Sequence, residues 1–219
     1  MSLLNNFTYK EYWRKAGLKK FYGQILIDLI KEKKPKNFLE IGVFTGVAAR
    51  NICELLFIIH QNNFLYCGID LFEDYKEAIS NEVIPKFIVN KQNFSNPLKS
   101  LIYNFILGEQ LNSHKSVTNF LKKFKNNIEL IKGNSKNILQ NINIKKFDMI
   151  FVDGGHSYET VKFELNLILK NANDDCLIVC DDYDHLEANG VKKAIDEAVI
   201  INSFKIKIVE KRFACLSKY

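Results

Sequence analysis

The order of the apolar segments is the feature of this sequence that most restricts its fold. Short apolar runs, typical of strands, alternate with longer segments in which apolar residues recur at helical spacing. This alternation predicts an α/β fold with a mostly parallel sheet, and the tight connection between the last two strands predicts an antiparallel edge hairpin. The expected strands are 37–43, 64–72, 128–133, 147–155, 174–182, 204–210 and 212–218, and the expected helices are 8–34, 46–59, 157–170 and 188–201.

The fourth expected strand ends in a carboxylate. Its sequence, FDMIFVDGG, is apolar on both faces up to Val152, as is typical of a strand inside a parallel sheet, and Asp153 follows directly. Ligands of such sheets bind outside the carboxyl ends of the strands. The position of Asp153 therefore indicates a functional site.

The segment between the second and third expected strands is too long for an ordinary crossover. Apolar residues at helical spacing predict an amphipathic helix in its last part. The earlier part, 74–113, is interpreted as a helical insertion, and we expect it to form a lid over a substrate site. The residues that define the amphipathic helix after the insertion are Val117, Phe120, Leu121 and Phe124.

Composition indicates a globular chain, with 47% hydrophobic and 26% charged residues among 219. No apolar run reaches the roughly 18 residues of a transmembrane helix, and no signal-peptide core follows Met1. The five cysteines are interpreted as reduced core residues, which favours a cytoplasmic protein. We expect a basic helical arm at 1–36 and one domain at 37–219.

The net charge of +6 is concentrated at the start of the chain. Residues 1–36 contain nine Lys and Arg against three Asp and Glu, whereas residues 37–219 contain 22 of each kind. Basic patches of this kind occur in nucleic-acid-binding proteins, but no nucleic-acid-binding motif accompanies the charge. We therefore expect no nucleic-acid partner and no membrane partner. A homo-oligomer is left open.

A glycine turn joins the first strand to the next helix. In FLEIGVFTGVAAR, Glu40, Gly42 and Gly46 form an E-x-G-x-x-x-G pattern. Glycines let the backbone approach a ligand, and the helix N-terminus offers free N–H groups. Asp70 ends the second strand, where a carboxylate can accept hydrogen bonds from both hydroxyls of a ribose. Phe44 departs from the G-x-G-x-x-G pattern of dehydrogenases.

From residue 37 onward, outside the insertion, the chain resembles the class I S-adenosylmethionine-dependent methyltransferases. LEIGVFTG is similar to their cofactor-binding first motif, CGIDLF to the ribose-binding second, and IKGNS, which contains Ser135, to the adenine-side third. FVDGGHSYETV, LIVCDDYDH and GVKKAIDEAV are most similar to the branch of macrocin O-methyltransferase and related sugar O-methyltransferases. The resemblance implies a Rossmann-like, seven-stranded sheet and binding of S-adenosylmethionine by Glu40, Gly42, Gly46, Asp70, Ser135 and Asp153.

The resemblance also implies a divalent metal, held by one Asp after strand four and an acidic pair after strand five. The matching residues are Asp153, Asp181 and Asp182. Three carboxylates offer only oxygen ligands, which suits Mg²⁺ or a similar hard cation. A cation there would lower the pKa of an acceptor hydroxyl for attack on the methyl group. The structural alternative is that the acidic pair caps the following helix.

His156 stands three residues after Asp153, where the catechol-type enzymes of the family place a catalytic lysine. An imidazole titrates near pH 6.5 and can accept the hydroxyl proton at neutral pH. The alternative is a turn histidine just before Ser157, the expected N-cap of the next helix. His185, shortly after the acidic pair, is the rival base.

The sequence thus predicts a metal-dependent O-methyltransferase that acts on a sugar or another small polyhydroxylated acceptor. Lysines of the insertion, among them Lys99, favour an anionic acceptor such as a nucleotide-linked sugar. Two alternatives remain open at this point. One is a metal-independent methyltransferase for another small molecule, and the other is a cofactor-binding protein without catalysis.

Overall fold

The computed structural model of the protein describes residues 4–74, 94, 96–106, 108, 110–185 and 189–218. Seven strands form one sheet in the order β3-β2-β1-β4-β5-β7-β6. Their bounds are β1 Asn37–Ile41, β2 Leu65–Asp70, β3 Ile128–Lys132, β4 Met149–Val152, β5 Leu177–Cys180, β6 Lys205–Val209 and β7 Phe213–Ser217.

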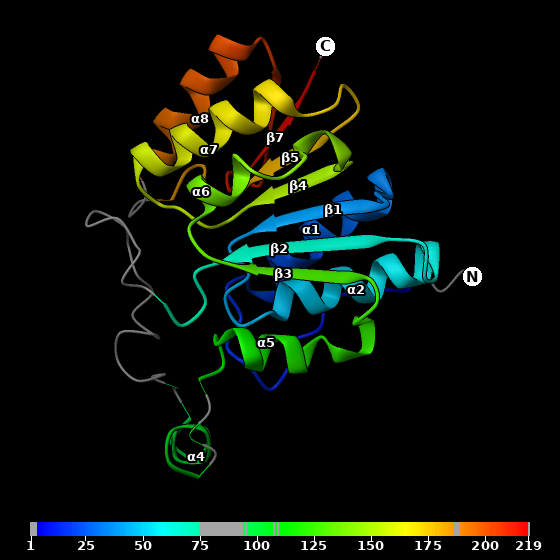
Figure 1. Cartoon of the computed structure of the whole chain (residues 1–219), viewed down its shortest axis with the longest axis vertical. Coiled ribbons are helices and arrows are strands. Elements are labelled where there is room, and N and C mark those ends of the chain that lie inside the picture. Colours follow the sequence, from blue (N-terminus) through cyan, green and yellow to red (C-terminus); the bar gives the residue numbers. More distant parts are fainter. Residues whose placement is uncertain are drawn as a thin grey trace.

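The strand pairing confirms the predicted mixed sheet. β1 to β5 are mutually parallel and point the same way in Figure 1, whereas β7 runs antiparallel between β5 and β6. The chain order reverses at β1, which lies between β2 and β4. The carboxyl ends of these three strands and of β5 therefore meet at one edge, next to the switch point at which ligands bind in open α/β sheets.

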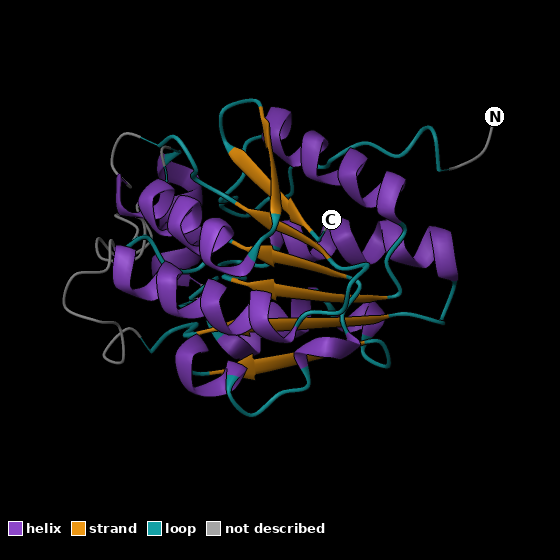
Figure 2. Cartoon of the chain, turned by 90° about the horizontal axis from the view of Figure 1, so that it is seen from above, coloured by secondary structure: helices purple, strands orange, loops and turns teal. Residues whose placement is uncertain are grey.

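Helices cover both faces of the twisted sheet, as the view from above shows (Figure 2). Residues of α1, α2 and α5 belong to the core on one face, and residues of α6, α7 and α8 belong to the core on the other. α4 and the π-helical turn Ile102–Ile106 lie at the far end of the molecule in Figure 1. The bounds are α1 Lys20–Lys33, α2 Val47–His60, α4 Pro97–Leu101, α5 His114–Phe120, α6 Ser135–Leu139, α7 Tyr158–Asn171 and α8 Asn189–Asn202.

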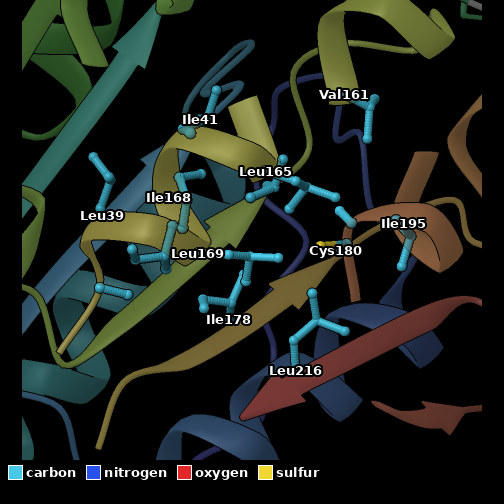
Figure 3. Packing of buried hydrophobic residues seen from close by; sticks show 14 of the residues in the cluster. Leu39, Ile41, Val161, Leu165, Ile168, Leu169, Ile178, Cys180, Ile195 and Leu216 are labelled. Carbon is cyan, nitrogen blue, oxygen red and sulfur yellow. The ribbon is translucent and has the colours of Figure 1, made fainter. Parts of the chain in front are cut away.

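Alternating residues of each strand enter opposite cores, because successive side chains of a strand point to opposite faces. In β1, Leu39 and Ile41 join the core under α7 and α8, while Phe38 joins the core under α1 and α2. Figure 3 shows Leu165 and Ile168 of α7 on the same side of the sheet as Leu39 and Ile41. The sheet is therefore buried on both faces. Ligands of such a sheet bind outside the carboxyl ends of its strands.

The first expected helix is shorter than predicted. Residues 4–19 form no helix, and α1 begins at Lys20. The buried ring of Tyr9 lies flat on Gly23, where an added Cβ would come within 2.6 Å of the ring. The Tyr9 N–H also donates to Gln24 Oε1 at 2.9 Å. Residues 4–19 therefore fold back over α1, a long-range contact that helical spacing alone does not reveal.

The segment 4–19 also contacts the turn that follows β1. Arg14 Nε donates to the carbonyl oxygen of Thr45 at 3.0 Å, and its Nη2 donates to Ser116 Oγ at 3.0 Å. The Thr45 hydroxyl donates to the carbonyl oxygen of Lys15. The segment 4–19 is thus hydrogen-bonded to the glycine turn and to α5.

All five cysteines are free and buried, as predicted from the sequence. Within the residues that the structure describes, no helix is long and apolar enough to cross a membrane. The insertion at 74–113 lies mostly outside the described residues, including Lys76, Lys86 and Lys91. Its predicted role as a lid therefore stays a prediction.

Candidate active site

The turn between β1 and α2 brings the backbone of β1 against the end of β4. Gly42 has a φ of +94°, and an added Cβ would lie 2.1 Å from the carbonyl oxygen of Asp153. Gly46, with a φ of +82°, is the N-cap of α2 and offers no side-chain cap to its N–H groups. The two glycines expected from the sequence are therefore required for backbone conformation and for close approach.

Asp70 holds this turn to the end of β2. One of its carboxylate oxygens accepts a hydrogen bond from Phe44 N–H at 2.8 Å, and the other accepts from Phe72 N–H. Burial raises the pKa of Asp70, and the backbone donors partly offset this rise. The carboxylate thus lies at the carboxyl end of β2, the position from which the predicted ribose contact would be made.

Glu40 is buried on the same face of the sheet as Phe38, 1% exposed, and accepts a hydrogen bond from the hydroxyl of Tyr66. Burial raises the pKa of Glu40 to about 8, although the Tyr66 hydrogen bond opposes the rise. Ser135, the first residue of α6, donates its hydroxyl to the buried Glu164 of α7. These two predicted cofactor residues therefore already have protein partners.

Three carboxylates follow β4 and β5 directly. The pairing of Val152 with Cys180 places the next residues, Asp153 and Asp181, side by side. Burial raises the pKa of Asp153 well above its ordinary value, and repulsion from Asp181 and Asp182 adds to the rise. A bound cation would reduce the repulsion between these neighbouring carboxylates.

His156 lies beside the last of these carboxylates. Its Nε2 is 3.2 Å from Asp182 Oδ2. Burial alone would raise the pKa of Asp182, but the His156 hydrogen bond and the charge of Arg212 leave it below its ordinary value. Ser157 is the N-cap of α7, as predicted, and accepts from Thr160 N–H. The rival base His185 is exposed and donates its backbone N–H to the carbonyl oxygen of Asp182.

Asp181 has a partner that the sequence motifs did not indicate. Arg212, in the turn between β6 and β7, donates from Nε to Asp181 Oδ1 at 2.5 Å and from Nη2 to Asp181 Oδ2 at 2.6 Å. The antiparallel pairing of Cys180 with Ala214 carries Arg212 to the end of β5. Asp181 Oδ1 also accepts a hydrogen bond from Asp182 N–H at 2.8 Å, so the carboxylate is engaged by both the guanidinium and the backbone.

The residues that the structure brings together as possible metal ligands differ from the predicted set by one member. One ligand atom each of Asp153, His156 and Asp182 lies within 4.8 Å of the others, while Asp181 is paired with Arg212. Oxygen ligands with one imidazole nitrogen fit a divalent cation such as Mg²⁺ or Mn²⁺. A pocket lies at this cluster, lined by Val152, Asp153, Gly155, His156, Val161, Cys180, Asp181, Asp182 and Val191.

The chain matches known methyltransferases in sequence and fold. The sequence model of a family described as "Methyltransferase domain" matches residues 39–183, more than half of the chain. No curated protein sequence matches it significantly.

Solved structures share the fold at low sequence identity. One is a methyltransferase from Podospora anserina with bound S-adenosylhomocysteine, at 16% identity and a TM-score of 0.58 over 92% of this chain and 80% of the other. Another is the O-methyltransferase TomG from Streptomyces achromogenes in complex with S-adenosylmethionine, at 15% and 0.58 over 93% and 82%. A third is CalS11, described as a TDP-rhamnose 3'-O-methyltransferase of calicheamicin biosynthesis, at 14% and 0.57 over 90% and 80%.

Proposed function

Because this chain belongs to the class I S-adenosylmethionine-dependent methyltransferases, we propose that it methylates a hydroxyl group of a sugar or another small polyhydroxylated molecule, with a divalent cation in its site. The observation that carries this proposal is the meeting of Asp153, His156 and Asp182 beyond the ends of β4 and β5. They offer cation ligands and a base at the edge where ligands of parallel sheets bind.

The glycine turn and the end of β2 are the proposed cofactor site. Gly42 and Gly46 leave room along the backbone, α2 presents the N–H groups of its first turn, and the Asp70 carboxylate would accept from the ribose hydroxyls. Glu40 and Ser135 support this site through Tyr66 and Glu164. When bound, S-adenosylmethionine supplies an electrophilic methyl group on its sulfonium sulfur.

Asp153 and Asp182 are the proposed cation ligands. A divalent cation held there supplies positive charge that favours the ionised form of an acceptor hydroxyl. Asp181, which belonged to the ligand set expected from the sequence, instead holds Arg212 beside these two residues. Its proposed role is therefore to orient the neighbouring carboxylates through Arg212.

His156 is the proposed general base. Its Nε2 lies 3.2 Å from Asp182 Oδ2, so a neutral ring that donates Nε2–H to this carboxylate would keep Nδ1 as its basic nitrogen. In the transfer, Nδ1 would accept the proton of the acceptor hydroxyl, whose oxygen would bond to the methyl carbon as the bond from that carbon to sulfur breaks. A positioned base of this kind contributes about 10²–10⁴-fold in rate.

The acceptor class rests on charge and on one structural neighbour. Lys99 of α4 belongs to the basic part of the insertion, and its Nζ lies 4.0 Å from the ring centre of Trp13. CalS11 is described as acting on TDP-rhamnose, a nucleotide-linked sugar. We therefore choose nucleotide-linked sugars as the first acceptors to test.

One observation favours a second candidate function. The guanidinium of Arg212 already supplies a positive charge to Asp181 and Asp182. A methyltransferase that needs no metal, in which the acidic residues position the acceptor, is the function that this arrangement would serve.

Transfer of a labelled methyl group to a panel of nucleotide-linked and neutral sugars tests the proposal. We expect labelled product, its loss in EDTA and its return with added Mg²⁺. The His156→Ala variant should lose about 10²–10⁴-fold in rate, and His185→Ala, the matched control, should retain the wild-type rate. Full turnover in EDTA would favour the metal-independent candidate, and absence of transfer to every hydroxyl acceptor would contradict the proposal.

A further inference from the structure

Arg212 reaches into the acidic cluster from an element that carries none of the proposed ligands. It lies in the turn between β6 and β7, and its carbonyl oxygen accepts from Tyr183 N–H at 2.9 Å, just after the acidic pair. Its guanidinium carbon lies 4.6 Å from the ring centre of Tyr22 in α1. Tyr183 therefore holds the backbone of Arg212, and Tyr22 packs against its guanidinium.

The guanidinium donates to both oxygens of Asp181, and Oδ1 also accepts from Asp182 N–H at 2.8 Å. The two hydrogen bonds, of 2.5 and 2.6 Å, form a bidentate pair, and the Asp181 side chain is only 1% exposed. Nη2 also lies 3.5 Å from Asp182 Oδ1. Bidentate pairing of this kind is strong and directional. A cation bound at Asp153 and Asp182 would therefore find the third carboxylate already engaged.

The charges of the cluster lead to the same result. Asp153, Asp181 and Asp182 carry a formal charge of −3 when ionised, and Arg212 reduces it to −2, which one divalent cation balances. Without Arg212 the cluster would attract a cation more strongly and would offer it one more carboxylate.

We propose that Arg212 is a positioning residue that acts as a built-in counter-cation, withholding Asp181 from a bound metal and thereby weakening divalent-cation binding at Asp153 and Asp182. The proposal deepens the proposed function, on which its metal depends. It concerns affinity for the cation itself, so it is testable without any acceptor.

Calorimetric titration of the metal-free protein with MgCl₂, and of the same protein with MnCl₂ followed by electron paramagnetic resonance, measures this affinity. We expect Arg212→Gln to bind either cation about tenfold or more tightly than the wild type. The double variant Asp181→Asn/Arg212→Gln should lose this gain, because Asp181 is the ligand that the single variant releases. Equal or weaker binding by Arg212→Gln would overturn the proposal.

Thermal unfolding supplies a second readout with a matched control. Arg50 forms a similarly half-buried pair with Glu54, at 2.9 Å and 19% exposure against 21% for Arg212. Both Arg50→Gln and Arg212→Gln should unfold at lower temperature than the wild type without metal, and Mg²⁺ should restore Arg212→Gln more fully than Arg50→Gln, which keeps the cation affinity of the wild type. Restoration of neither variant, or of both equally, would contradict the proposal.

The outcomes separate this proposal from the proposed function. Binding by Arg212→Gln together with no binding by the wild type would support the counter-cation and contradict metal dependence of the natural protein. Identical binding by both would overturn the counter-cation and leave metal dependence intact. Should Arg212→Gln fail to fold, Arg212→Lys, which keeps the charge but not the bidentate geometry, is expected to bind Mg²⁺ more tightly than the wild type. Equal binding by that variant would overturn the proposal.

Discussion

Glu40 is an ionisable side chain buried against one face of the sheet. It is 1% exposed, and burial raises its pKa to about 8 from an ordinary value of 4.5. Between these two pH values the folded protein retains a proton that the unfolded chain has released. The free energy of unfolding therefore falls as pH rises from about 4.5 to about 8. Tyr66 limits the loss, because its hydroxyl donates to the carboxylate.

The Glu40→Gln variant tests this linkage in the absence of cofactor. We expect it to lack the Glu40 contribution to the slope, which is at most about 1.4 kcal/mol per pH unit. Chemical denaturation of the variant and the wild type at pH 5 and pH 8 measures the effect. The wild type should lose more stability than the variant between the two pH values, and parallel losses would show that Glu40 does not titrate in this range.

At the scale of elements, the turn between β1 and α2 contributes both to the packing of the sheet and to the proposed cofactor site. Gly42 lies against the backbone of Asp153, so the proposed cofactor turn directly contacts the first proposed cation ligand. The motif pattern predicted both glycines, because a turn of this kind needs residues without a Cβ. It did not reveal the Asp153 contact, which depends on the pairing of β1 with β4.

Gly42→Ala should destabilise the protein strongly, because its Cβ would lie 2.1 Å from a carbonyl oxygen in addition to the cost of φ +94°. Gly108 is the control, since it has φ +58° and, among the residues that the structure describes, no non-neighbouring atom lies within 4 Å of an added Cβ. We expect Gly108→Ala to cost about 1–2 kcal/mol, the usual penalty for a positive φ, and Gly42→Ala to cost more. Equal losses in denaturant titrations would show that the turn relaxes without strain.

At the scale of the whole molecule, the sequence predicted the parallel sheet, the terminal hairpin and the strand ends that carry Asp70, Asp153 and Asp181. These features follow from local patterns, such as apolar runs and the residue after each run. Arg212 and the packing of Tyr9 on Gly23 follow from contacts between distant segments, which periodicity does not encode. The insertion at 74–113 matched no motif, so the acceptor is inferred from charge and from a neighbour.

In the proposed function, the carboxylates after β4 and β5 perform the chemistry, and the glycine turn and Asp70 bind the cofactor. A substitution of Asp182 tests the two functions separately, because Asp182 lies beside His156 beyond the end of β5, whereas Asp70 lies at the end of β2. Removal of its charge should therefore affect turnover and leave cofactor binding nearly unchanged. Asp184, an exposed carboxylate paired with Lys192 at 3.2 Å, provides a control two residues away.

The most direct measurement determines cofactor affinity by calorimetry and methyl-transfer rate on the same preparations of wild type, Asp182→Asn and Asp184→Asn. We predict that Asp182→Asn binds S-adenosylmethionine within about twofold of the wild type and loses about 10²-fold or more in rate, the scale of a lost ligand or base contact. Asp184→Asn should match the wild type in both measurements. A wild-type rate in Asp182→Asn would contradict the assignment of chemistry to this edge.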